Sequence, residues 1–117
     1  MELEEYLAQA KTTAIFKKEI PLLADENLVP LLYNGLKING EAGEVAEEIG
    51  KMLRDDDGAL TVDRRNRIIK ELGDVIWYWV MICDLVHVRP DEVMKKNIEK
   101  LAERKAKGTL GGSGSDR

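Results

Sequence analysis

Cysteine and histidine are almost absent from this sequence of 117 residues, which has one of each, Cys83 and His87. A single cysteine cannot form an intrachain disulfide or a cysteine-rich zinc site. It suits a reducing cytoplasm, which we take as the expected location. A ferritin-like di-iron centre needs Glu-x-x-His pairs, and the residue three positions before His87 is Asp84. The sequence therefore excludes that centre as well.

Proline and long apolar segments are also scarce. Only three prolines occur, and β-branched residues never alternate with polar ones over the length of a strand, so we expect an all-α protein. The longest apolar run, residues 75–83, is too short to span a bilayer. The acidic start, residues 1–11, lacks the basic and apolar regions of a signal peptide. We expect no membrane partner.

The charge balance is acidic, with 22 Asp and Glu against 18 Lys and Arg, and a pI near 5.1. Proteins that coat nucleic acid are usually basic, so no nucleic-acid partner is expected. An acidic protein can bind an anionic ligand through a divalent cation. An EF-hand calcium loop is excluded in the segment 53–64, because Leu53 and Arg64 occupy the first and last ligand positions.

Periodicity and capping residues predict four helices in a single domain, residues 1–108. The tail, residues 109–117, is rich in Gly and Ser and looks flexible on composition. Thr61 is a plausible N-cap for the third helix, and Pro90 suits the first turn of the fourth. The expected helices cover residues 2–18, about 31–54, 61–86 and 90–107.

The third helix is apolar on nearly all sides between Ile68 and Val86. A short four-helix chain can cover such a helix on only two or three sides. We therefore expect a homodimer or homotetramer whose subunits complete the bundle core. The alternative is that the first helix covers it within one chain.

The second helix carries an unusual set of acids. At 100° per residue, Glu41, Glu44 and Glu48 lie together on one flank of the apolar stripe, and Glu47 lies on the opposite side. Lys37 and Lys51 share the flank of the three acids. The stripe itself comprises Ile38, Ala42, Val45, Ile49 and Met52.

A second polar stripe crosses the apolar third helix, where Glu71 and Asp74 stand three residues apart between Arg67 and Tyr78. Carboxylates in such places are costly unless they have partners. They could pair with the nearby cations, or bind a divalent metal that prefers oxygen ligands, such as Mg²⁺ or Mn²⁺. The fourth helix adds an aligned amide and two cations, which suit either phosphate binding or a solvated face: Asn97, Lys100 and Arg104.

These segments resemble the MazG-like all-α nucleoside triphosphate pyrophosphohydrolases, of the short single-domain bacterial and phage type. "GEAGE" (residues 40–44) and "ELGD" (residues 71–74) fit the family's Glu-x-x-Glu and Glu-x-x-Asp signature, and the resemblance covers residues 31–117. It implies Mg²⁺, with Mn²⁺ as a substitute. The implied ligands are Glu41, Glu44, Glu71 and Asp74, with Glu48 as a further candidate.

The resemblance also implies residues that contact a nucleotide. Tyr78 and the aligned residues of the fourth helix, Asn97, Lys100 and Arg104, match family positions, and Lys37 and Lys51 are further candidates. We expect the tail residues Ser113, Ser115 and Arg117 to close over the phosphates. Lys51 stands where some relatives carry an aromatic residue for base stacking. Base recognition could instead use residues 12–16, residues 33–39, or Trp77 and Trp79, although both tryptophans fit a core better.

The implied reaction is hydrolysis of a (deoxy)nucleoside triphosphate between the α- and β-phosphates, with Glu41 and Glu44 as the pair from which the general base comes. Two alternatives remain open from the residues. The chain could be a non-catalytic helical interaction module whose acids are ion-paired. It could also be a pyrophosphohydrolase for another nucleotide-like substrate, because a fold does not fix a function.

Overall fold

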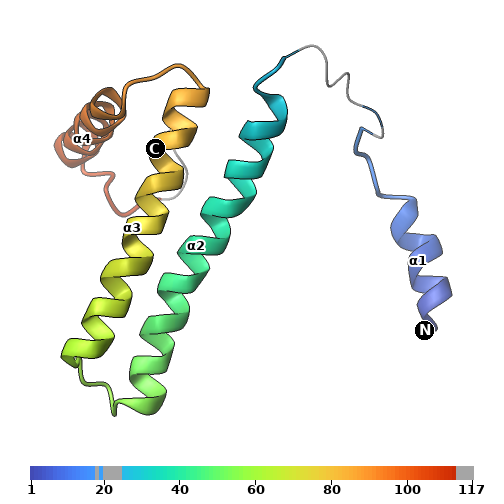
Figure 1. Cartoon of the computed structure of the whole chain (residues 1–117). Helices are drawn as coiled ribbons and strands as arrows, with labels where there is room; N and C mark the ends of the chain where they lie inside the picture. Colours follow the sequence, from blue (N-terminus) through green and yellow to red (C-terminus); the bar gives the residue numbers. More distant parts are fainter. Residues whose placement is uncertain (18, 20–24, 113–117) are drawn as a thin grey trace.

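The computed structural model describes residues 1–17, 19 and 25–112, and this part of the chain is made of α-helices joined by turns and loops, without strands (Figure 1). The all-α prediction is confirmed. No helix in these residues is long and apolar enough to cross a membrane. In chain order the helices are α1 (Leu3–Lys11), α2 (Leu28–Asp55), α3 (Val62–Leu85) and α4 (Pro90–Lys107).

The two longest helices, α2 and α3, form an antiparallel hairpin and make most of the contacts between helices (Figure 1). The turn after α2 has two successive residues with positive φ, Asp57 at 52° and Gly58 at 75°. The Gly58 N–H donates to the carbonyl of Met52 at 3.2 Å, which closes the end of α2. Asp and Gly are among the residues that adopt this backbone conformation most readily. The turn sequence therefore fixes how α3 folds back on α2.

The sequence signals for helix ends are confirmed in α3 and α4. The Thr61 hydroxyl accepts a hydrogen bond from the Arg64 N–H at 3.1 Å, as an N-cap does. Pro90 stands at the start of α4, and Gly108, with φ of 70°, ends it. His87, just past the end of α3, has a positive φ of 59°.

Two predicted boundaries are wrong. α1 ends at Lys11 rather than at residue 18, and the Thr12 and Thr13 hydroxyls donate to carbonyls of its last turn. α2 begins at Leu28 and includes Pro30, which was assigned to the preceding loop. A proline is tolerated there because the first N–H groups of a helix have no partner within the helix.

The contact between α2 and α3 is one narrow seam. Ile38, Val45 and Met52, seven residues apart on α2, are half-buried, whereas Ala42 and Ile49 of the predicted stripe are exposed. A spacing of seven is the pattern of a two-helix seam. The predicted stripe is therefore only partly covered within one chain.

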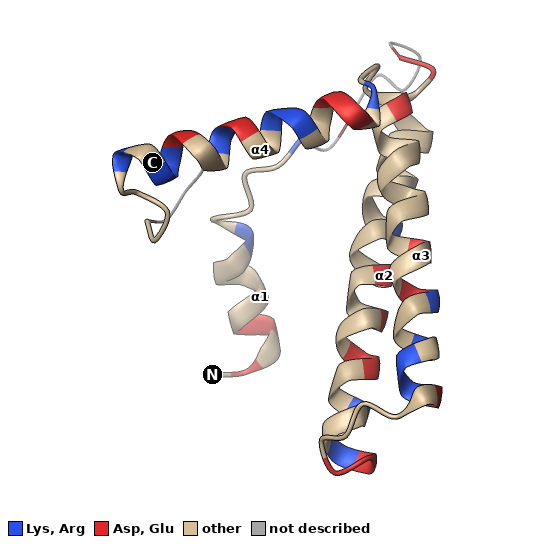
Figure 2. Ribbon diagram, turned by 90° about the vertical axis from the view of Figure 1, so that its left-hand side faces the viewer, with Lys and Arg blue, Asp and Glu red and all other residues tan. Residues whose placement is uncertain are grey.

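The chain has very little core of its own. Cys83 is the one buried apolar side chain among the described residues. The radius of gyration is 20.1 Å, compared with about 13 Å for a compact domain of this length. α1 lies apart from the hairpin, and α4 extends sideways from its end (Figures 1 and 2). α1 does not cover α3, so the alternative in which the first helix covers it within one chain does not occur here.

Candidate metal centre and nucleotide site

The hairpin brings three of the predicted metal ligands together. One carboxylate oxygen from each of Glu41 on α2 and Glu71 and Asp74 on α3 can be chosen so that all three lie within 4.8 Å of one another. We call these three residues the acidic group. Glu41 and Glu71 are half-buried, and Asp74 is exposed. The group therefore opens to solvent on one side while the two helices support it on the other.

The turn between the helices explains this arrangement. Glu41 and Glu71 lie at equal distances along the chain from Asp56, so the antiparallel hairpin places them opposite each other. Asp74 follows Glu71 by three residues and so shares its face of α3. The position of the group is set by the turn and by the spacing of the acids together.

The acidic group has little positive charge to balance it. Among the described residues, Lys37 is the cation that pairs with it, with its Nζ 3.9 Å from Glu41 Oε1. Three carboxylates at this separation repel one another, and a bound cation would relieve that repulsion. Carboxylate oxygens are the ligands that Mg²⁺ and Mn²⁺ prefer. The donor set fits a hard divalent cation.

Glu44, the fourth predicted ligand, lies beside the acidic group rather than in it. It is exposed, and its strongest interaction is with Glu47. The charge of Glu47 and a side-chain hydrogen bond to it raise the pKa of Glu44 above its usual range, and some desolvation and the charges of Glu71 and Glu41 raise it further. Glu44 is thus close enough for the charges of the acidic group to affect its pKa. Its role as a metal ligand stays a prediction.

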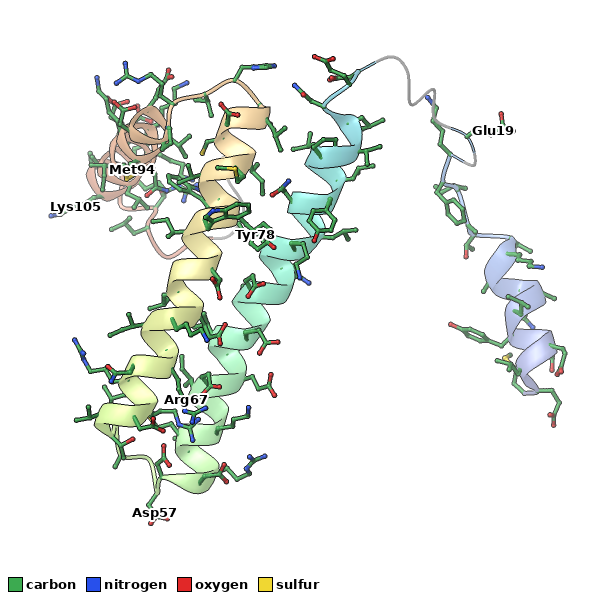
Figure 3. All side chains as sticks on the ribbon, in the orientation of Figure 1. Glu19, Asp57, Arg67, Tyr78, Met94 and Lys105 are labelled. Atoms are coloured by element: carbon green, nitrogen blue, oxygen red, sulfur yellow. The ribbon has the colours of Figure 1, made fainter. Side chains whose placement is uncertain are left out.

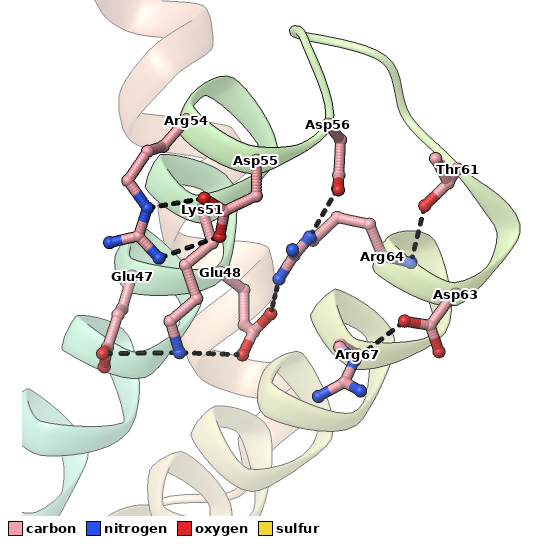
Figure 4. Close-up of polar contacts among 10 residues, drawn as sticks. All are labelled: Glu47, Glu48, Lys51, Arg54, Asp55, Asp56, Thr61, Asp63, Arg64 and Arg67. Carbon is pink, nitrogen blue, oxygen red and sulfur yellow. Dashed lines mark hydrogen bonds and ion pairs between the residues drawn. The ribbon is translucent and has the colours of Figure 1, made fainter.

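Glu48, the further candidate ligand, has a different set of partners (Figure 4). Arg64 Nη1 donates to Glu48 Oε2 at 2.6 Å, and Arg64 Nε donates to Asp56 Oδ2 at 2.8 Å. Lys51 Nζ lies 3.7 Å from Glu48 Oε1. We call Glu48, Lys51, Asp56 and Arg64 the turn network. The hydrogen bond to Asp56, then that to Glu48, raises the pKa of Arg64 above its usual value, so the guanidinium stays charged.

Arg64 is the residue that the sequence analysis overlooked, since it was considered only for an EF-hand. A signal was available, because Glu48 and Arg64 lie at equal distances from Asp56, as Glu41 and Glu71 do. In an antiparallel hairpin such residues face each other. Lys51, a candidate for phosphate binding, is also engaged here, at 3.5 Å from Glu47 and 3.7 Å from Glu48.

A cavity of about 350 Å³ adjoins the acidic group, lined by Glu41, Asp74, Trp77 and Tyr78. Tyr78 stands on α3 beside α2 (Figure 3). Its ring lies 6.0 Å from Lys37 Nζ and meets the Trp77 ring edge-on, with centroids 4.9 Å apart. Tyr78 and Lys37 therefore lie next to the acids, as the sequence analysis expected of residues that contact a substrate.

The predicted contacts on α4 do not reach this cavity within the chain. Asn97 lines a separate groove between α3 and α4, together with Trp79 and Met94. Lys100 is exposed and Arg104 is buried, on a helix that extends away from the middle of the hairpin (Figure 2). The tail residues Ser113, Ser115 and Arg117 lie outside the described residues.

Comparison with known proteins is consistent with this geometry. The model of the MazG nucleotide pyrophosphohydrolase domain matches residues 32–109, which include α3, α4 and nearly all of α2. The chain is 36% identical over 118 residues to the Gene 37 protein of Mycobacterium phage L5, over the full length of both. It is 35% identical over 69 residues to the uncharacterized protein YvdC of Bacillus subtilis, covering 55% of this chain and 65% of that protein.

No solved structure matches the chain significantly. The family match spans both acidic helices and the turn that sets them opposite each other. The full-length relative has the same extent as this chain. On this basis the chain belongs to the MazG nucleotide pyrophosphohydrolase family.

Proposed function

We propose that the protein hydrolyses (deoxy)nucleoside triphosphates between the α- and β-phosphates in a reaction that depends on a divalent metal ion. The observation that supports this best is the acidic group, in which Glu41, Glu71 and Asp74 come within 4.8 Å on two facing helices. The adjoining cavity of about 350 Å³ falls within the range of small-molecule sites. A family of nucleotide pyrophosphohydrolases gives the reaction class.

The acidic group would hold the metal ion, Mg²⁺ or Mn²⁺ in its place. When bound, the ion supplies positive charge against the triphosphate and lowers the pKa of a water molecule. Glu41, half-buried and paired loosely with Lys37, would direct its carboxylate toward the metal ion. Lys37, beside Glu41 and Tyr78, would contact the phosphates.

The proton of the attacking water goes to a glutamate of α2. Glu44 suits this role among the α2 acids because its carboxylate lies beside the acidic group rather than in it, so it can accept a proton while the others hold the metal. The water oxygen forms a bond to the α-phosphorus, and the bond to the bridging oxygen breaks. The products are a nucleoside monophosphate, pyrophosphate and one proton. No Ser, Cys or His nucleophile is needed for such an in-line displacement.

We also propose that a second copy of the chain covers the apolar face of α3 and α4. A groove of about 610 Å³ there is lined almost only by apolar side chains, including Leu72, Ile76 and Met94, each about half exposed. Isolated soluble chains rarely expose such continuous apolar surface. The ends of α2 and α3 nearest the start of α4 carry few charges (Figure 2). Light scattering should give a dimer or tetramer, and a monomer at micromolar concentration would overturn this proposal.

The oligomer bears on the residues of α4. Because Asn97 and Lys100 do not reach the acidic group in their own chain, their predicted contact with the nucleotide requires another copy or a different position of α4. Mixing an Asp74→Asn subunit with a Lys100→Ala subunit tests this. Activity recovered on mixing would show that one site uses both chains.

The activity itself is tested with purified protein, Mg²⁺ and each of the common (deoxy)nucleoside triphosphates. The expected products are the monophosphate and pyrophosphate in equal amounts. Release of inorganic phosphate would point to a different bond. No release from any nucleotide, together with unchanged metal binding in Glu41→Gln, would favour a non-catalytic interaction module instead.

A further inference from the structure

Two tryptophans of α3 that were expected in the core have different surroundings. Trp79 is half-buried in the grooves between α3 and α4, next to Met94. Trp77 is 54% exposed and lines the cavity beside the acidic group. Within one chain, Trp77 therefore does not lie in a core. A large aromatic ring left open beside a polar cavity usually has a ligand or a partner to cover it.

The cavity has two chemically different ends. Glu41 and Asp74, two members of the acidic group, line one part of it, and the rings of Trp77 and Tyr78 line the other. Trp77 follows Asp74 by three residues on the same helix face, which places their Cβ atoms about 5–6 Å apart. A nucleotide whose phosphates lay at the acids would have its sugar and base next to the two aromatic rings.

The contact between the two rings orients Trp77 without covering it. The ring planes are 82° apart, with centroids separated by 4.9 Å. An edge-to-face contact covers at most one face of the indole, and Trp77 stays 54% exposed beside the cavity. Lys37 lies on Tyr78, 6.0 Å from its centroid, rather than on Trp77. Trp77 is thus the more exposed of the two rings that line this cavity.

We propose that Trp77 is the surface on which the heteroaromatic base of the substrate stacks, and that it distinguishes nucleotides from other triphosphates. This rests on the proposed function, because the phosphates must lie at the acidic group for the base to reach Trp77. Stacking on an aromatic side chain is worth about 1–3 kcal/mol per base and is tolerant of base identity. It follows that the enzyme requires an aromatic base but selects weakly among the bases.

The experiment measures binding, so that it does not depend on turnover. The probes are α,β-methylene-dATP, which cannot be cleaved at the bond in question, and inorganic tripolyphosphate, which lacks a base, each with Mg²⁺. Trp77→Leu should weaken binding of the nucleotide analogue about tenfold or more, and leave tripolyphosphate unchanged. Trp77→Phe should retain most of the affinity. Trp79→Leu, on the same helix, is the matched control and should affect both probes equally or neither.

Fluorescence gives a second readout. In Trp79→Phe the one remaining tryptophan is Trp77, and its emission should be quenched by the methylene analogue but not by tripolyphosphate. The proposal would be overturned if Trp77→Leu weakened the binding of both probes equally or left the affinity for the analogue unchanged. A smaller oligomer of this variant in light scattering would overturn it as well. Quenching by the analogue without hydrolysis of dATP would contradict the proposed function while leaving the role of Trp77 intact.

Discussion

The α2–α3 hairpin contains two clusters of acidic residues that differ in how the chain balances their charge. In the turn network, Glu48 and Asp56 share the guanidinium of Arg64 at 2.6 and 2.8 Å. In the acidic group, Glu41, Glu71 and Asp74 face one another, and Lys37 approaches only Glu41, at 3.9 Å. Both clusters are built by the same two helices across the same seam. The acids of the turn network stabilise the hairpin through a cation that the chain itself supplies.

The acidic group has no such stabilising cation in the described chain, so its charges oppose the approach of α2 and α3. An arrangement that is unfavourable by itself becomes favourable when a divalent cation binds. The two clusters therefore serve different purposes. We propose that one sets the position of the helices and that the other would use that position to hold a metal ion. This distinction can be tested by removing a charge from each.

The largest expected effect is on activity when the acidic group is changed. Removing a residue that only supports a metal ligand typically lowers metal affinity or activity by about 10–100-fold. Removing a ligand itself should cost more, so Asp74→Asn should lower kcat/KM by more than about 100-fold. Its Tm without metal should be unchanged or higher, because a repelling charge is gone. Nucleotide hydrolysis and a thermal melt in EDTA measure the two effects. A large fall in Tm would show that Asp74 stabilises the hairpin as the turn network does.

The next effect is stabilisation by the metal. Mg²⁺ or Mn²⁺ at 100 times its Kd should stabilise the wild-type protein by about 2.7 kcal/mol, seen as a rise in Tm. Asp74→Asn should lose most of this rise, and Glu48→Gln should keep it. Equal loss in the two variants would mean that Glu48 is a ligand of the metal, as the sequence also allowed.

The reverse pattern is expected for the turn network. Arg64→Met should lower Tm by several degrees, because Glu48 and Asp56 lose their shared partner in a place where little water reaches them. The rise in Tm with metal should persist in this variant. Adding Glu48→Gln to Arg64→Met should recover part of the loss, since it removes a charge that has lost its hydrogen-bonded cation. No recovery would argue against the pair as the cause.

The smallest effect is expected at the surface of the same hairpin. Arg54 and Asp55 form an exposed pair with an N–O distance of 2.7 Å, just before the turn. Exposed pairs of this kind contribute little, so Arg54→Ala should leave both the Tm and the rise with metal unchanged within error. A fall in Tm as large as that of Arg64→Met would mean that any positive charge near the turn stabilises the hairpin, rather than the contact that Arg64 makes with both Glu48 and Asp56.

Much of the hairpin was predictable because its signals are local. The cap at Thr61, Pro90 and Gly108 each act within a few residues, and the sequence placed these ends correctly. The flank of α2 that carries Glu41 and Glu48 also followed from helical periodicity. Periodicity could not predict which residue of α3 faces each acid of α2. That pairing decides whether an acid contacts Arg64 or other acids.

The remaining differences involve contacts that a single sequence does not specify. α1 ends early, at Lys11, and lies apart from the hairpin without packing to extend it. The exposure of Trp77 could not be foreseen, because an apolar helix suggested burial on all sides, whereas α2 covers only a narrow seam of α3. The direction of α4 depends on the short connection after α3, where His87 adopts a positive φ.

The equal spacing of both clusters about Asp56 limits how the chain can change its length. One residue inserted within α2 between Glu48 and Asp56 would rotate Glu41 and Glu48 by about 100° relative to the turn, so that neither Arg64 nor Glu71 would meet its counterpart. The same insertion before Leu28 would leave the hairpin as it is. Changes of length in this part of α2 should therefore be accepted only in steps close to a whole helical turn.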